Sequence, residues 1–343
     1  DLINALVLLT NFVILPATTY GSQLALGALG ITLIYSILRF GNFAHGDTMS
    51  LGTIFTIFFT WLFIYLGVQL GPIPYILPVQ LPTALLALPF GILVTIATVI
   101  LTDRFVFRYF RLQRVPPIML TIVSVGVMFV YAGLVRFLIG TNEQRFNDGD
   151  KWIWKTRTIK KFFELNEGVG LKVSQGLTIV IAVLVVIAVF WFLNRTKTGK
   201  SMRAYSDNED LALLSGISPD RVVMITWILG ATLATIAGVL FGLDKSFKPF
   251  TYFQLLLPMF AAAIVGGVGQ PVGAIVGGYV IAFSEVLVTY AYKKFLKYLL
   301  PEGLEPTSLM QFLGTEYKFA VSFILLVLVL LIRPTGIFKG KVI

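Results

Sequence analysis

The few polar residues inside the apolar segments are the first candidates for chemistry in this chain. Glu285 is the only carboxylate well inside an apolar run. An acid in the membrane interior is costly unless it faces a cavity or a partner. Two interpretations fit its position equally well: a group on a solute path, or a carboxylate near the outer interface that reaches water. Glu285 is therefore a candidate pathway residue.

A second polar site lies between two apolar runs, where residues 41–47 read GNFAHGD. Backbone in this position cannot face lipid, so protein must cover it or water must line it. The simpler interpretation is a loop in which Asp47 bonds the start of the next helix. The alternative is a narrow polar point in a translocation path, with Asn42 and His45 as pathway residues. The sequence slightly favours the interpretation as a loop.

Residue counts and spacing argue against catalysis in this chain. It has no cysteine and one histidine, so no thiolate metal site, disulfide or histidine cage is expected. That histidine lies in a connecting loop, which does not suggest a hydrolase triad. The stretch TGKS at 198–201 imitates the end of a phosphate-binding loop, but the glycine required at 194 is Asn194 and no strand precedes it. We predict no cofactor, no metal and no enzymatic activity.

The composition places these residues in a membrane protein. Of 343 residues, 57% are hydrophobic and only 13% are charged, against about 25% in soluble domains. The net charge of +10 comes from basic residues in short loops, which is typical of cytoplasmic loops and does not indicate nucleic-acid binding. The first apolar run lacks a preceding basic region, which argues against a cleaved signal peptide.

Ten apolar segments have roughly the length that crosses a bilayer, about 20 residues. They predict an all-α integral membrane protein with a single transmembrane domain over 1–343. The first, eighth and last are short enough to be re-entrant. The segments are 2–17, 20–38, 48–70, 83–103, 116–139, 175–193, 222–243, 254–269, 271–291 and 317–332.

Basic residues in three places predict the orientation, because cytoplasmic loops are rich in Lys and Arg. One group follows the fourth segment, one lies in 194–221 and one follows the last segment. Ten crossings place all three groups, and both termini, in the cytoplasm. The residues are Arg104, Arg108, Arg111 and Arg114; Arg195, Lys197, Lys200, Arg203 and Arg221; and Arg333, Lys339 and Lys341.

Two longer connections are expected on the outer, periplasmic side. The loop 140–174 mixes charges of both signs, and its Trp152 and Trp154 suit either an interfacial anchor or a lid. The stretch 293–316 begins with lysines and is expected to hold a short helix lying on the membrane surface.

The cytoplasmic loop 194–221 contains a predicted short helix at 206–216. Ser206 and Glu209 have the spacing of a capping box. Three leucines, at 211, 213 and 214, give the helix an apolar side, and Gly216 is a natural stop. Pro219 after Ser218 begins the next helix. An amphipathic helix between spans suggests docking to a motor protein.

Glycines dominate 266–278, which reads GGVGQPVGAIVGG. Gly269, Gly273 and Gly277 recur every four residues and let a helix approach its neighbour closely. Close packing is the more common reason for such a pattern. The alternative is a broken helix that lines a solute path, with Gly266, Gly267 and Gly269 as pathway residues.

Three stretches together resemble a known family: NFAHGD at 42–47, GKSMRAYSDNEDLALLSGISPDRV at 199–222, and AAAIVGGVGQPVGAIVGGYVIAFSE at 261–285. They are similar to the permease subunits of bacterial ABC importers for branched-chain amino acids, with urea and amide permeases as close relatives. Their order and spacing match from about residue 20 to the end of the chain. The loop 140–174 departs from the pattern by its length.

The resemblance implies a bacterial inner-membrane subunit with several partners. These are a second, homologous permease, two cytoplasmic ATP-binding subunits and a periplasmic solute-binding protein. It also implies that the short cytoplasmic helix docks on the ATPase, with an aspartate in place of the usual leading glutamate. The docking residues would be Asp210, Leu211, Ala212, Leu214 and Gly216.

The expected function is ATP-driven import of a small neutral or zwitterionic solute, with branched-chain or other neutral amino acids first. A urea or short-amide permease is the alternative within the same class. An ion-coupled transporter, in which Glu285 would be essential, and a channel are alternatives of another class.

Overall fold

The computed structural model describes residues 2–70, 79–146, 148–154, 160, 168–299, 308 and 310–338. Three predicted features fall partly outside this range: the loop 140–174 at 155–159 and 161–167, the stretch 293–316 at 300–307 and 309, and the basic tail at Lys339 and Lys341.

The described part of the chain is almost entirely helical and contains nine runs long and apolar enough to cross a membrane, which confirms the predicted fold class. The membrane-length elements are α1 (Leu2–Leu9) and α2 (Leu15–Leu38), joined by a π turn; α3 (His45–Tyr65); α4 (Ala84–Thr102) and α5 (Arg108–Leu112), joined by a second π turn; α6 (Pro117–Ile139); α8 (Val173–Arg195); α11 (Pro219–Lys245); α12 (Pro249–Gly266); α13 (Pro271–Thr289); and α15 (Lys318–Ile332) behind a 3₁₀ turn at Thr315–Tyr317.

The short elements lie in the connections. They are α9 (Lys197–Asp207), α10 (Glu209–Leu214), α14 (Lys293–Leu299) and the antiparallel strands β1 (Trp152–Trp154) and β2 (Leu171–Lys172).

The number of spans differs from the predicted ten because the first two segments form one helix, Leu2–Leu38. Pro16 lies at the end of the predicted segment 2–17, and a proline inside a helix removes one hydrogen bond while its ring crowds the preceding turn. The structure places the π turn Thr10–Ile14 immediately before it. The wider turn gives the ring room, and the helix continues without a break.

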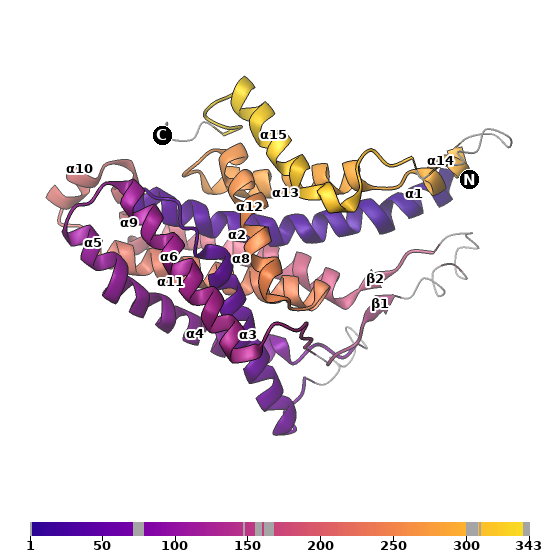
Figure 1. The fold of residues 1–343 in the computed structure, drawn as a ribbon, viewed down its shortest axis with the longest axis horizontal. Helices are drawn as coiled ribbons and strands as arrows, with labels where there is room; N and C mark the ends of the chain where they lie inside the picture. The colour runs from indigo at the N-terminus through magenta and orange to yellow at the C-terminus, as the bar shows by residue number, and fades with distance from the viewer. Residues whose placement is uncertain are drawn as a thin grey trace.

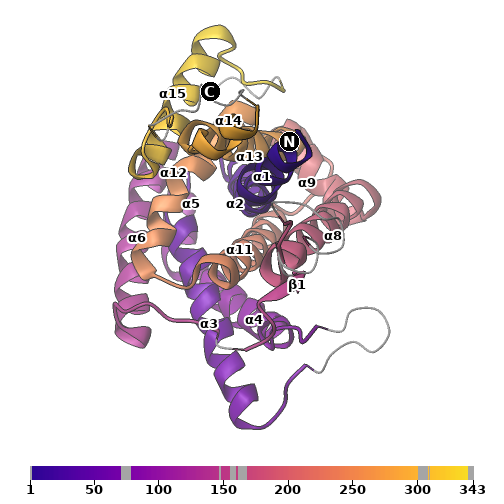
Figure 2. The same ribbon diagram turned by 90° about the vertical axis from the view of Figure 1, so that its right-hand side faces the viewer.

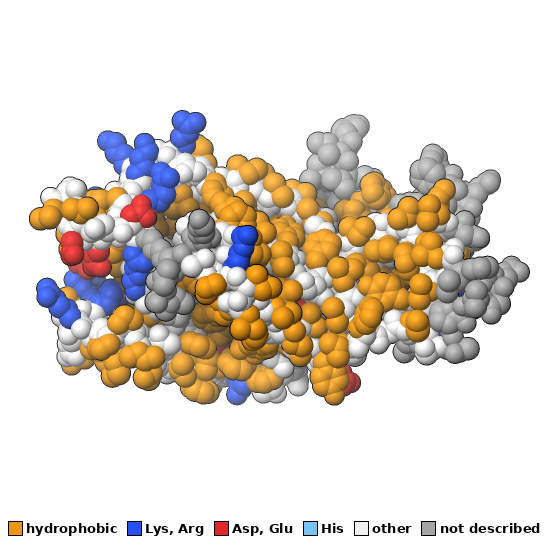
Figure 3. All heavy atoms as spheres, turned by 90° about the horizontal axis from the view of Figure 1, so that it is seen from above, with side chains coloured by type: hydrophobic (Ala, Val, Ile, Leu, Met, Phe, Trp, Pro, Cys, Tyr) orange, Lys and Arg blue, Asp and Glu red, His pale blue; other side chains and the backbone are white. Residues whose placement is uncertain are grey.

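The core is built from helices in the middle of the bundle. Helix α2 packs on α11 and α13, α3 packs between α4 and α11, and α12 packs on α13 (Figures 1 and 2). In contrast, α8 and α15 expose most of their apolar side chains. Helices that are apolar all round but exposed on one side suit contact with lipid. Figure 3 shows this as a broad apolar surface along the bundle.

The spans alternate in direction, so the connections gather at two ends (Figure 1). One end carries α5, α9 and α10, and it is the end where Lys and Arg side chains cluster in Figure 3. Here Arg108 pairs with Asp220. The opposite end carries α14 and the β1–β2 hairpin, and here residues 144 and 247 form an isolated β-bridge. We call these the basic end and the hairpin end.

Candidate translocation path and motor-docking surface

The predicted short helix exists as α10, at the extremity of the basic end (Figure 1). Asn208 caps it: its side-chain Oδ1 accepts the Leu211 backbone N–H at 3.0 Å. Gly216 ends it in the left-handed conformation, φ +79°, and the N–H of Ile217 donates to the Ala212 carbonyl at 3.0 Å. The predicted stop at Gly216 and the start of α11 at Pro219 are therefore confirmed.

The predicted capping box at the start of this helix is wrong. Thr196 caps α9 by accepting the Gly199 N–H at 3.0 Å, and α9 runs to Asp207, so Ser206 lies inside a helix. Glu209 accepts the Tyr205 hydroxyl at 2.5 Å instead of turning back to the backbone. Partial burial and this carboxylate raise the pKa of Tyr205.

The predicted docking residues divide into two sets. Leu211 and Leu214 are 61% and 84% exposed, and Asp210 and Gly216 are exposed beside them. Ala212 is only 4% exposed and faces its own chain, so it cannot contact a partner directly. Leu213 is exposed as well, so three leucines of this six-residue helix form a small apolar surface at the basic end. Such surfaces on otherwise polar segments mark contact sites.

Arg39 connects this region to the interior. It ends α2 in the left-handed conformation, φ +58°, and its guanidinium donates to the Ser206 carbonyl at the end of α9. The next residue, Phe40, is buried and stacks on Phe107 with ring centres 5.5 Å apart. The segment that follows α2 is therefore held to the docking region on one side and to the core on the other.

The polar segment 41–47 is covered by protein, as expected for backbone that cannot face lipid. Asn42 Oδ1 accepts the Ala44 N–H at 3.2 Å, and the Asn42 carbonyl accepts the His45 N–H at 3.3 Å. The interpretation in which Asp47 caps the helix is wrong, because Asp47 is already inside the first turn of α3, whose N-cap residue is Ala44.

His45 and Asp47 are both buried, at 1% and 3% exposure. Within the described residues, His45 Nε2 and Asp47 Oδ2 have no hydrogen-bond partner. The imidazole packs against Gly30 of α2, and Asp47 lines a cavity of about 220 Å³ that Arg136 also lines. Buried polar atoms without partners are uncommon and suggest a site with another role than packing.

The glycines of 266–278 bring two helices into backbone contact. A methyl group at Gly277 would overlap the Ala262 carbonyl, and one at Gly273 would overlap the Gly266 carbonyl. Gly267 and Gly269 have positive φ, +113° and +80°, and turn the chain between α12 and α13. The last described turn covers this hairpin, since the N–H of Phe338 donates to the Gly266 carbonyl at 3.0 Å. These contacts support close packing.

Glu285 lines a cavity of about 610 Å³ toward the hairpin end of the bundle. The residue is 1% exposed, and Ser322 of α15 donates to its Oε1. The half-buried Lys318 lines the same cavity, and its ammonium lies 5.6 Å from the ring centre of Tyr20. Ser322, Lys318 and Tyr20 were not predicted from the sequence as neighbours of Glu285. The one signal in the sequence was Lys318, a lysine at the start of the last apolar run.

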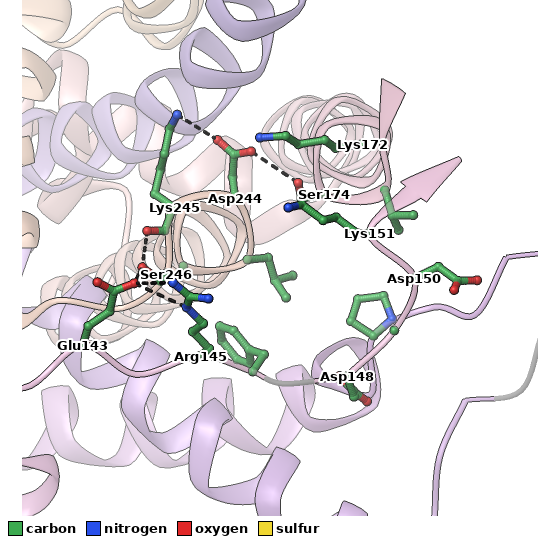
Figure 4. Close-up of a pocket in the computed structure, with 16 residues that line it drawn as sticks. Glu143, Arg145, Asp148, Asp150, Lys151, Lys172, Ser174, Asp244, Lys245 and Ser246 are labelled. Carbon is green, nitrogen blue, oxygen red and sulfur yellow. Dashed lines mark hydrogen bonds and ion pairs between the residues drawn. The ribbon is translucent and has the colours of Figure 1, made fainter. Parts of the chain in front are cut away.

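A second cavity, of about 490 Å³, is polar and lies beside the first at the hairpin end (Figure 4). Glu143 accepts from Ser246 at 2.6 Å and pairs with Lys248 at 3.0 Å. These hydrogen bonds lower the pKa of Glu143 to about 2. In Figure 4, Lys245 pairs with Asp244, which also accepts from Ser174. This network ties the loop after α6 to the α11–α12 connection.

Comparison with known proteins identifies the family. The model for the family described as branched-chain amino acid transport system / permease component matches residues 13–330. The chain belongs to this family. Family membership and the nine apolar helices make it a multi-pass inner-membrane transport subunit.

Three relatives are similar over almost their whole length. LivH of Escherichia coli (strain K12), a high-affinity branched-chain amino acid transport system permease protein, is 27% identical over 93% of this chain and 92% of LivH. BraD of Pseudomonas aeruginosa, with the same description, is 28% identical over 93% and 92%. A probable branched-chain amino acid transport permease of Methanocaldococcus jannaschii is 27% identical over 94% and 90%. Among solved structures, PsaBC from Streptococcus pneumoniae in complex with Fab gives a TM-score of 0.46 at 12% identity over 93% of this chain and 91% of that one.

Proposed function

We propose that this chain is the translocation subunit of an ATP-driven importer of small neutral or zwitterionic solutes, with branched-chain or other neutral amino acids as the substrate class. The observation that carries the proposal is α10, a capped helix that exposes Leu211 and Leu214 at the basic end. A solute pathway alone does not require such a surface. A subunit that receives its energy from a separate protein does.

The partners follow from this assignment. Two cytoplasmic subunits bind and hydrolyse ATP, a second, homologous permease completes the pathway, and a periplasmic protein delivers the solute. The chain itself carries no cofactor and no catalytic site. Closure of the ATP-binding subunits would move α10, and the Arg39 contact with Ser206 would pass that movement to the segment 41–47.

The basic end faces the cytoplasm in this proposal. The three basic groups lie at the ends of the third, fifth and ninth spans of the described residues, around α5, after α8 and after α15, so all three lie on one side. Nine crossings then put the residue-2 end on the periplasmic side and Arg333 in the cytoplasm. The loop 140–174 and its hairpin face the periplasm, whereas 194–221 faces the cytoplasm.

We assign His45 and Glu285 to the pathway because each is buried and has a polar atom without a hydrogen-bond partner among the described residues. We add Asn42, which is also buried and whose carbonyl accepts the His45 N–H. Gly266, Gly267 and Gly269 serve it indirectly by setting the close approach of α12 and α13.

The test is uptake into vesicles that contain the complete complex, with leucine, urea and acetamide in competition. We expect leucine uptake that requires ATP, and leucine as the strongest competitor. Leu214→Asp should leave the complex in the membrane but lower uptake per ATP hydrolysed roughly tenfold, whereas Asn194→Asp, which adds the same charge in the same loop, should not. ATP-independent uptake would contradict the proposal and favour a channel or an ion-coupled transporter.

A further inference from the structure

The outward cavity is lined by two groups of opposite charge, the buried Glu285 and the half-buried Lys318, which lie near each other without direct contact. Among the described residues, neither Glu285 nor Lys318 takes part in an ion pair; the pairs that form involve other side chains. Glu285 Oε1 accepts from Ser322, but Oε2 has no hydrogen-bond partner. A charge near lipid without a partner is costly, and such groups usually face a ligand or a water-filled path.

Lys318 is the matching cation, and it is positioned by aromatic rings. Its ammonium lies 4.7 Å from the ring centre of Phe319 and 5.6 Å from that of Tyr20. Cation–π contacts hold an ammonium in place without neutralising its charge. Lys318 is only half-buried, so a solute in the cavity can reach it.

Three of the other charges of the cavity wall are already paired, and Lys172, at the end of β2, is a second lysine of the wall outside the ion pairs of the described residues. Asp244 contacts Lys245 at 3.7 Å, and Lys248 contacts Glu143 at 3.0 Å. Apolar side chains of Phe12, Phe241 and Val286 complete the wall. The cavity thus combines a buried anion beside Tyr20 and Ser322, an accessible cation at Lys318 and an apolar surface, in a volume of about 610 Å³ that falls in the range of small-molecule sites.

We propose that this cavity is a solute site, in which Glu285 Oε2 binds the α-ammonium group of a neutral amino acid and Lys318 Nζ binds its α-carboxylate. The apolar wall then receives the side chain. The inference rests on the proposed function and narrows it, because urea and simple amides carry neither charge. Glu285 lies one turn before the end of α13, so the site is in the outer part of the membrane, where a delivered solute first enters.

The experiment measures competition for radiolabelled leucine bound to the complex of this chain with its partner permease and ATP-binding subunits in lipid nanodiscs. The solute-binding protein is left out because it binds amino acids itself. Isocaproate lacks the ammonium group, and leucinamide lacks the carboxylate. We expect leucine to compete at least about tenfold better than either analogue. This factor corresponds to the free energy that one charge-assisted hydrogen bond contributes to binding.

The variants separate the two contacts. Glu285→Gln should abolish the preference for leucine over isocaproate but keep the preference over leucinamide, and Lys318→Met should do the reverse. Glu316→Gln and Lys294→Met, exposed residues of the same types outside the cavity, should keep the wild-type order. The exchange Glu285→Lys with Lys318→Glu should restore both preferences, since a zwitterion can bind in the opposite direction.

Several results would overturn the site. One is that Glu285→Gln and Lys318→Met both keep the wild-type preferences for leucine over isocaproate and leucinamide. Another is that the exchanged variant assembles with the ATP-binding subunits but does not regain these preferences. If the variants lose co-purified phosphatidylethanolamine while the competitors keep their wild-type order of strength, the cavity binds a lipid headgroup and not the solute. Failure of the proposed function is seen separately, as a wild-type complex that takes up no amino acid, and it would overturn both proposals. Amino-acid uptake with an unchanged order overturns only the site.

Discussion

Single residues in this chain show how strongly context changes the role of a side chain. Ser206 and Glu209 have the spacing of a helix cap, yet Asn208 caps the helix because α9 has already absorbed Ser206. Asp47 precedes an apolar run like a cap residue, yet it lies within the first turn of α3, which begins after Ala44. A local pattern predicts that a helix begins nearby, but which side chain reaches the free N–H groups depends on where the previous element ends.

Glu143 gives a pH dependence that can be measured on the isolated protein. Its folded pKa is about 2, below the ordinary value of 4.5, so its contribution to stability is present above pH 4.5 and is lost as the pH falls toward 2. We expect Glu143→Gln to lower the melting temperature of the detergent-purified chain at pH 6 but not at pH 2. High salt should reduce the difference, because the group is exposed. An equal effect at both pH values would contradict this assignment.

Gly277 provides a test of helix contact. Gly277→Ala would place a methyl group on the Ala262 carbonyl, and we expect a loss of about 1–3 kcal/mol of stability, the usual cost of overpacking. Gly126→Ala is the matched control, since a methyl group there meets nothing within 4 Å. Thermal unfolding followed by size-exclusion chromatography measures both. Equal stability of the two variants would show that α12 and α13 are not in backbone contact.

At the scale of elements, the segment after α2 contacts both the basic end and the core. Arg39 donates to the Ser206 carbonyl of α9, Phe40 stacks on Phe107, and the segment continues directly into Asn42 and His45. Packed elements tend to shift between discrete arrangements instead of deforming smoothly. A displacement of α9 and α10 should therefore reach the interior through this segment.

Arg39→Met tests that link. The variant loses the donor to the Ser206 carbonyl but keeps an unbranched apolar stem, so we expect ATP hydrolysis to continue while uptake per ATP falls about tenfold. Arg203→Met, an exposed arginine on α9, is the control and should keep the wild-type ratio. An unchanged ratio in the Arg39 variant would leave the segment with a purely structural role.

At the scale of the whole molecule, the nine spans and the clustered basic loops make a topology that can be tested directly. The chain has no cysteine, so a maleimide can label only the single cysteine that is introduced. We expect a membrane-impermeant maleimide to label Leu2→Cys and Glu316→Cys in intact cells with a permeabilised outer membrane, and Ser215→Cys only after the inner membrane is opened. Labelling of Ser215→Cys in intact spheroplasts would place α10 in the periplasm and contradict motor docking.

The sequence alone determined the membrane class, nearly all the spans and the short helix with its stop at Gly216. These features depend on local composition and periodicity, which a chain carries wherever it folds. The family was indicated separately, by the resemblance of three motifs in matching order and spacing. Even the merged first span has a local cause, a π turn beside Pro16.

Only the tertiary structure decided what surrounds the polar groups. Glu285 was visible in the sequence, but Tyr20, Lys318 and Ser322 are distant along the chain and reach it only because the first and last spans pack near α13. The glycines of 266–278 likewise became packing residues once α12, α13 and the last turn were seen together. The energy of a buried charge or a close helix contact depends on neighbours in space, and local sequence does not specify those neighbours.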